Sequence, residues 1–414
     1  MLVADGNHGE YRPRSDEFGQ GEYAFIRAAD MDDGRVLFDS AQRINDQALA
    51  RIRKGVGHGG DVLFSHKGTV GKLALVPLDA PPFVCSPQTT FWRTLDEGRL
   101  DRRYLYYFMR SRAFKDQWMA RSNETDMAAY VSLTAQRQLN VALPEIDEQL
   151  AIAGVLGALD DKIAQNRRTA RALERLARAI FRAWFVDFEP VKAKVAGADS
   201  FPSMPQDVFD ALPTQFVGSE IGPVPKGWEV KTISESIHLT MGQSPPSEFY
   251  NEIGEGLPFH QGVTHYGFRF PTHRVYCTTE GRIAEPDDVL LSVRAPVGRI
   301  NVADRRLILG RGLAGLRHRS DCQSFLRQQI SHIFAEEDAI GDGTIYKAVA
   351  KRFLEQMPLL SPPRQAREEF ENLTRPLDNL IAVCEVESRK LAETRDLLLP
   401  QLLTGQSRVE VGNG

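Results

Sequence analysis

The chain has 414 residues, of which 42% are hydrophobic and 26% are charged, and its formal net charge is −4. This composition is typical of a soluble globular protein, and the length allows two or three domains with ample cores. No apolar run is long enough to span a membrane. The charge excludes a chain that is basic throughout, so binding to DNA would require locally concentrated cations or a basic partner.

The amino-terminal sequence and the cysteines indicate the compartment. MLVADGNHGEYRPR has no basic segment followed by an apolar one, so no secretory signal is predicted. The four cysteines form no CxxC pair, which argues against a zinc site or a disulfide framework. We therefore expect a cytoplasmic protein with buried free thiols at Cys85, Cys277, Cys322 and Cys384.

Residues 1–143 are predicted to form a first mixed domain of short strands and helices. The segment DVLFS (61–65) is typical of a buried strand, and KLALVP (72–77) is its expected hairpin partner. The stretch from Arg103 to Met119 is expected to form one helix whose aromatic side chains pack in a core.

Residues 144–190 are predicted to form a long helix, whose seam from Ile152 to Trp184 is a rod of roughly 50 Å at about 1.5 Å per residue. Apolar or small residues recur in steps of four and three, which favours a coiled coil over an ordinary amphipathic core helix. Asn166 is the one polar residue in this seam, where a buried amide typically fixes the register. The seam consists of Ile152, Leu156, Leu159, Ile163, Asn166, Ala170, Leu173, Ala177, Ile180 and Trp184.

Residues 191–224 are rich in Pro, Gly and Ser and are interpreted as a linker, and residues 225–361 as a second mixed domain. This domain repeats the hairpin of the first at a shift of 227 positions, from Asp61 to Asp288. The repeat preserves a cation on each side of a small-residue turn. These cations are Lys67 and Lys72 in the first domain and Arg294 and Arg299 in the second.

Residues 362–405 repeat the long helix at a shift of 218 positions, from Pro144 to Pro362. The second seam is poorer, and Pro376 and Pro400 are predicted to kink or end the helix. Two imperfect seams of equal length are most simply satisfied by packing on each other. The second seam consists of Phe370, Thr374, Leu377, Ile381, Cys384, Ser388, Leu391, Arg395, Leu398 and Leu402.

This order of elements resembles the specificity subunit of type I restriction–modification enzymes. The resemblance covers essentially the whole chain and rests on LPEIDEQ, ALDDKI, FRAWFVDFEP, IGPVPKGW, the two DVL-x-S elements and LLLPQLLTGQ. It implies a mixed α/β (α+β) fold with a pseudo-two-fold internal repeat. Two target recognition domains would each read one half of a bipartite, asymmetric DNA site, separated by an antiparallel coiled coil.

The resemblance also implies the partners. They are double-stranded DNA, two modification (methyltransferase) subunits and, in complexes that carry them, restriction or translocase subunits. S-adenosylmethionine, ATP and Mg are then expected on those partners, and no catalysis on this chain. One departure is that the second domain begins with GWEVKTISESIHLTMGQSPP where the first has only MLVADGNHGEY, so the first domain is expected to lack its opening strand.

Cations beside small residues suit DNA, because cations bind phosphates and a compact backbone can approach closely. A hairpin with solvated cations remains an equally good interpretation of any one of these residues. The candidate DNA-binding residues are Lys67, Thr69, Lys72, Arg294, Arg299, Arg311 in a basic stretch, and Lys347 in the loop GDGTIYK, with His8 as a further guess.

Enzyme motifs are missing from the sequence. The run from Gly310 to Gly315 fits GxGxxG, but no strand–helix–strand unit surrounds it, and neither a Walker loop, an Asn-Pro-Pro-[Tyr/Phe] motif nor HExxH occurs. We therefore predict a non-catalytic DNA-recognition subunit without catalytic or metal-binding residues. Two alternatives stay open, a scaffold that binds only proteins and an autonomous DNA-modifying enzyme with an unrecognised site.

Overall fold

The computed structural model describes residues 1–125, 128–335, 339–340, 344–345 and 348–409. The chain divides into two compact units, unit 1 comprising Met1–Ile163 with Arg389–Gly414, and unit 2 comprising Ala164–Ser388. Each unit holds one mixed domain together with part of both long helices, α5 (Ile146–Phe185) and α11 (Arg364–Leu403).

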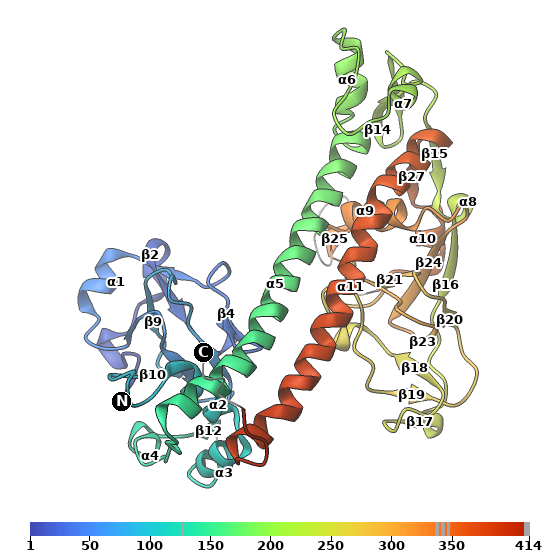
Figure 1. The fold of residues 1–414 in the computed structure, drawn as a ribbon. Helices are drawn as coiled ribbons and strands as arrows, with labels where there is room; N and C mark the ends of the chain where they lie inside the picture. Colours follow the sequence, from blue (N-terminus) through green and yellow to red (C-terminus); the bar gives the residue numbers. More distant parts are fainter. Residues whose placement is uncertain (126–127, 336–338, 341–343, 346–347, 410–414) are drawn as a thin grey trace. The chain divides into compact units, whose positions relative to one another are not determined.

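An antiparallel four-stranded sheet is repeated in the two units (Figure 1). In unit 1 its order is β1 (Leu2–Asp5), β10 (Thr89–Arg93), β7 (Val62–Ser65) and β8 (Leu73–Leu75). In unit 2 the order is β16 (Ile237–Met241), β24 (Leu313–His318), β21 (Val289–Ser292) and β22 (Ile300–Val302). The central strands β7 and β21 are buried along their whole length, which confirms the two predicted hairpins.

A second sheet in each unit contains a parallel pair. In unit 1 the order is β5 (Arg43–Ile44), β2 (Phe18–Ile26), β9 (Phe83–Cys85) and β6 (Val56–Gly57), and β2 is parallel to β9. In unit 2 it is β17 (Tyr250–Asn251), β19 (Tyr276–Cys277), β18 (Leu257–His260), β23 (Leu307–Leu309) and β20 (Ile283–Ala284), and β18 is parallel to β23. The predicted mixed α/β fold with an internal repeat is therefore confirmed.

Shorter elements complete the two domains. Unit 1 has α1 (Asp46–Arg51), α4 (Leu133–Gln136) and the strand pairs β3 (Met31–Asp32) with β4 (Arg35–Val36) and β11 (Asn123–Thr125) with β12 (Ala128–Tyr130). Unit 2 has α8 (Ile233–Ser236), α9 (Gln323–Ile333), α10 (Lys351–Gln356), β25 (Ala339–Ile340) with β26 (Thr344–Ile345), and β15 (Glu229–Thr232) with β27 (Pro358–Ser361).

The helix expected from Arg103 to Met119 is two helices, α2 (Arg102–Arg110) and α3 (Arg112–Met119). Ser111 separates them because its backbone is extended (ψ 156°) and its hydroxyl accepts a hydrogen bond from the Phe114 N–H at 3.2 Å. A serine cap of this kind starts a new helix.

The expected absence of an opening strand in the first domain concerns one strand and not the repeated sheet. β1 pairs with β10 as β16 pairs with β24, so the repeated four-stranded sheet is complete in unit 1. The element without a counterpart among described residues 1–125 and 128–143 is β15, the partner of β27.

The stretch interpreted as a linker is folded. It forms α6 (Glu189–Val195), α7 (Gln206–Asp210) and a hairpin of β13 (Phe216–Ser219) with β14 (Gly222–Pro225). Its apolar side chains pack with the aromatic end of α5 and with Phe370 of α11. The buried members from this stretch are Val191, Val208, Phe209, Leu212 and Val224.

The seams of α5 and α11 pack on each other within each unit. In unit 1, Ile152 and Leu156 share a core with Leu399 and Leu402. In unit 2, Ala170 and Leu173 pack with Ile381 and Cys384, and Trp184 lies 6.1 Å from Phe370 between ring centroids. As α5 advances, its partners on α11 move back along the sequence, so the pairing is antiparallel in both units.

Polar seam residues find partners within this pairing. The Asn166 amide donates to the Glu387 carboxylate at 2.7 Å, Thr374 donates to the Phe370 carbonyl at 2.7 Å, and Arg395 lies 2.5 Å from Asp160. The other predicted seam residues are buried or half-buried: Leu159, Ile163, Ile180, Leu377, Leu391 and Leu398. Neither Pro376 nor Pro400 ends α11.

All four cysteines are free and buried, as predicted. No helix among the described residues is long and apolar enough to cross a membrane.

Candidate nucleic-acid interface

The turn that follows β7 has the same hydrogen bonds as the turn that follows β21. The Lys72 N–H donates to the Ser65 hydroxyl at 2.8 Å, and the Arg299 N–H donates to the Ser292 hydroxyl at 2.9 Å. The Ser65 and Ser292 N–H groups donate back to the Lys72 and Arg299 carbonyls, each at 2.9 Å. The sequence repeat therefore encodes one turn geometry in two places.

Most of the predicted turn residues lie at the surface. Lys67, Thr69, Arg294 and Arg299 are exposed. The Lys67 ammonium also lies 5.9 Å from the centre of the Tyr130 ring, an arrangement that favours a cation and keeps this side chain at the mouth of the turn.

Lys72 does not fit the predicted role. Its ammonium donates hydrogen bonds to the carbonyls of Ala28 and Met31 at 3.0 and 2.9 Å, so it ties the turn to the neighbouring segment. Reaching a phosphate would break both bonds. We therefore assign Lys72 a structural role and leave the exposed cations as candidates.

A second turn, between the parallel-pair strand and the central sheet, reaches the same end of the sheet. In unit 1 the His66 N–H donates to the Gln88 carbonyl at 2.9 Å, and in unit 2 the Val293 N–H donates to the Gly312 carbonyl at 2.9 Å. Arg311 is exposed on this second turn in unit 2. Lys347 lies outside the described residues.

The loop that follows the edge strand packs against the second turn in each unit. Gly6 after β1 and Gly242 after β16 have no room for a side chain, because an added Cβ would lie 2.0 Å from the Cys85 oxygen or 2.2 Å from the Gly310 oxygen. Four segments thus meet at one end of the sheet in each unit. We call this the loop corner, comprising residues 6–8, 27, 67–71 and 86–88 in unit 1 and 242–244, 261, 294–299 and 310–312 in unit 2.

Sequence reasoning missed several exposed polar residues of the loop corner, namely Gln88, Gln243 and Gln261, together with the half-buried Ser244. The signal that could have found them is the shared glycine of DGNH (5–8) and MGQS (241–244), each of which follows the edge strand.

An ion pair supports the base of each sheet. Arg93 lies 2.7 Å from Asp61 and Arg317 lies 2.7 Å from Asp288, so both arginines are held at the end of the sheet away from the turns.

At the loop corner of unit 1, burial disfavours ionised Asp5, but hydrogen bonds from Lys54 and His8 outweigh this and hold its pKa below the ordinary value. His8 Nε2 lies 2.9 Å from that carboxylate.

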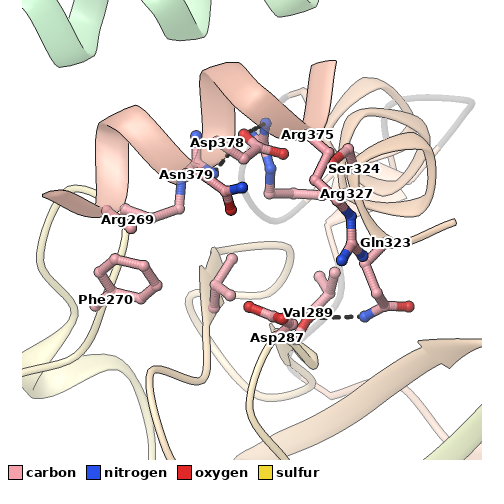
Figure 2. Close-up of a pocket in the computed structure, with 12 residues that line it drawn as sticks. Arg269, Phe270, Asp287, Val289, Gln323, Ser324, Arg327, Arg375, Asp378 and Asn379 are labelled. Carbon is pink, nitrogen blue, oxygen red and sulfur yellow. Dashed lines mark hydrogen bonds and ion pairs between the residues drawn. The ribbon is translucent and has the colours of Figure 1, made fainter. Parts of the chain in front are cut away.

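A buried ion network fixes the domain of unit 2 to the helices. Glu174 of α5 and Asp378 of α11 both contact Arg269 and Arg327, at 2.5 to 2.8 Å. Figure 2 shows Arg269, Arg327 and Asp378 around a pocket that Asp287 and Gln323 also line. In unit 1 Asp160, related to Asp378 by the 218-residue repeat, accepts a hydrogen bond from Tyr107 at 2.8 Å.

Comparison with known proteins relates the chain to one family. Residues 3–175 match the family model described as the type I restriction modification DNA specificity domain. The chain is similar to the specificity subunits of type I restriction–modification systems, and residues 3–175 carry their DNA specificity domain. These matches support a sequence-specific DNA-recognition subunit.

The relatives cover most of the chain. The putative type I restriction enzyme MjaX specificity subunit of Methanocaldococcus jannaschii is 28% identical, over 89% of this chain and 82% of its own length. The HindI specificity subunit of Haemophilus influenzae is 22% identical, over 92% and 94%. The type I restriction–modification S subunit of M. genitalium shares the fold, with a TM-score of 0.55 at 14% identity, over 97% and 93%.

Proposed function

We propose that this specificity subunit reads a bipartite, asymmetric DNA site and binds one half-site at the loop corner of each unit. The observation that carries the proposal is that both loop corners share one backbone frame but present different side chains. Each loop corner would bind one half-site. Because the side chains differ between the two loop corners, the two half-sites would differ in base sequence.

The chemistry of the loop corners supports this assignment. Exposed cations at the repeated turn, Lys67 in unit 1 and Arg294 and Arg299 in unit 2, suit phosphates. Polar side chains on the adjoining loops suit base edges in the major groove. The net charge of −4 is compatible with this role, because exposed cations lie at the repeated turns.

We further propose that the helices hold two modification subunits, with restriction or translocase subunits in complexes that carry them. The outer face of α11 in unit 2 supports a protein partner, because Leu380, Val383 and Val386 are 45%, 60% and 47% exposed. S-adenosylmethionine, ATP and Mg would then be bound by those cytoplasmic partners, and this chain would bring no cofactor of its own.

The test is methylome sequencing of cells that express this chain with its modification subunits. We expect one bipartite methylated motif, and no methyl transfer when the purified chain alone is given S-adenosylmethionine and DNA. Methylation that lacks a defined motif, or methyl transfer by the chain alone at a stoichiometric rate, would contradict the proposal.

A further inference from the structure

We propose that Gln261 and Arg311 of unit 2 read bases directly and that Ser244 positions them. On this proposal, which rests on the proposed function, the half-site bound by unit 2 contains an adenine contacted by Gln261 and a guanine contacted by Arg311. The three residues come from three different loops of the loop corner.

Ser244 links the other two residues. Its hydroxyl donates a hydrogen bond to Gln261 Oε1 at 2.7 Å and accepts one from the Arg311 N–H at 3.2 Å. The Gln261 amide oxygen is thereby held in place, while Gln261 as a whole is exposed. A fixed orientation reduces the entropy lost when a side chain binds a base edge.

Glycines bring Arg311 against Gln261. An added Cβ at Gly310 would lie 2.6 Å from Gln261 Cα, and one at Gly312 would lie 2.5 Å from the backbone carbonyl oxygen of Gln261. The Gly312 N–H donates to that same oxygen at 3.1 Å. Only residues without a side chain allow this approach, so the glycines hold the backbone on both sides of Arg311 against Gln261.

The strand beneath Gln261 is held by buried side chains. His260 Nε2 lies 2.9 Å from His273 Nδ1, and His273 Nε2 lies 2.8 Å from Asp304. The Gly310 N–H also donates to the His260 carbonyl at 2.8 Å. The loops that carry Gln261 and Arg311 are therefore both anchored on His260, whose side chain is held by His273.

The residue types match base recognition. Glutamine can bind adenine through two hydrogen bonds and arginine can bind guanine through two, both in the major groove. Backbone contacts of the frame recur in unit 1, where the Ser86 N–H donates to the Ile26 carbonyl at 2.8 Å. The residues at the positions of Gln261 and Arg311 there are Arg27 and Pro87.

The difference at Arg27 is informative. Its guanidinium donates to both carboxylate oxygens of Asp30, at 2.9 and 3.1 Å, so it is occupied within unit 1. The frame is thus common to both units, whereas the side chains placed to contact bases are not. This is the pattern expected of residues that determine specificity.

The experiment uses the complex of this chain with its modification subunits and variants Arg311→Ala and Gln261→Ala. The matched control is Arg306→Ala, an arginine 60% exposed, 3.2 Å from Glu285, at the opposite end of β23. Binding is measured to the methylated motif and to duplexes with each single base pair replaced. We expect each variant to lose about five- to 150-fold of discrimination at one position of one half-site. The control should retain wild-type discrimination.

Two outcomes would overturn the proposal. Uniformly weaker binding with a salt dependence reduced by about one contact would make Arg311 a phosphate ligand. Unchanged discrimination in both variants, with wild-type melting temperatures, would show that Gln261 and Arg311 do not read bases. Either result leaves the proposed function intact, which instead fails if the wild-type complex shows no sequence preference.

A second experiment exchanges the side chains between the units. The double variant Ser244→His with Gln261→Arg should change the preferred base pair, and retention of the original motif counts against the proposal.

Discussion

Glu174 of α5 and Asp378 of α11 share the guanidinium of Arg327, which lies 2.8 Å from each carboxylate. Arg269 bridges the same two acids from a loop of the domain in unit 2. The two arginine side chains are 7% exposed, so the charges are largely removed from water and depend on each other.

Removal of one acid should therefore destabilise unit 2. We expect Asp378→Asn to lower the free energy of unfolding by about 3–5 kcal/mol, because a buried arginine loses its counter-charge. The measurement is urea unfolding followed by tryptophan fluorescence. The control Asp161→Asn removes an exposed pair with Arg103 and should cost less than about 1 kcal/mol. Equal costs for the two variants would show that the network does not stabilise unit 2.

The same network predicts a dependence on pH. Burial raises the pKa values of Glu174 and Asp378, but Arg327 and Arg269 outweigh it, and both end below their ordinary values of 4.5 and 3.8. The acids therefore stabilise the fold at pH values above those ordinary values, and this is lost as pH falls through the lowered ones. The stability difference between wild type and Glu174→Gln with Asp378→Asn should shrink in acid. A difference that stays constant down to about pH 2 would contradict this assignment.

Lys67 and Lys72 should behave differently although both belong to the repeated turn. We expect Lys67→Ala to weaken DNA binding and to reduce its salt dependence by about one phosphate contact. Lys72→Ala should instead lower the melting temperature of unit 1, since the ammonium loses two carbonyl partners. Salt titrations of binding and thermal unfolding of both variants distinguish these effects. A reduced salt dependence for Lys72→Ala alone would reverse the two roles.

Exchange of the first domain should change half of the DNA site. Replacing residues 1–143 with the equivalent domain of a relative is expected to alter one half of the methylated motif and leave the other unchanged. The contacts of that domain with Ile152, Leu156 and Leu399 should be retained in the graft, because they complete its core. Methylome sequencing provides the measurement, and changes in both halves would mean that the units read the site jointly.

Lengthening both helices should lengthen the spacer between the half-sites. Asn166 faces Glu387, so one heptad inserted near Arg167 and one near Glu385 lie opposite each other and keep the seam in phase. Each helix gains roughly 10 Å, equivalent to about three base pairs. We expect a motif with unchanged halves and a spacer about one to three pairs longer. An active variant with the original spacer would exclude the helices as its determinant, and three residues inserted in one helix alone should abolish assembly.

Local periodicity explains what the sequence could predict. Regular spacings mark the seam from Ile152 to Trp184 and the hairpin strands at 61–65 and 72–77. Each of these elements occurs twice in the sequence, so that one copy supports the assignment of the other. The hydrogen bonds of Lys72 could not be predicted, because its partners, Ala28 and Met31, are distant in sequence. The segment 191–224 has no period, and its folding depends on aromatic residues of both long helices.

The loop corner shows the same limit. Ser244, Gln261 and Arg311 are separated by 17 and 67 residues along their hydrogen-bonded pairs, so no window of sequence contains the site. The glycines that flank Arg311 resembled a nucleotide-binding motif, although their role in the structure is to admit the backbone of Gln261.

Unit 1 is assembled from both ends of the chain, whereas unit 2 is one continuous segment. Leu399 and Leu402 contribute to a core whose other members begin at Val3. During synthesis, residues 164–388 leave the ribosome before those leucines, so unit 2 can gain all its contacts first. Until these leucines are synthesised, the first domain and the start of α5 keep exposed the apolar surface that the leucines will bury. The domain that is translated first is therefore the one completed last.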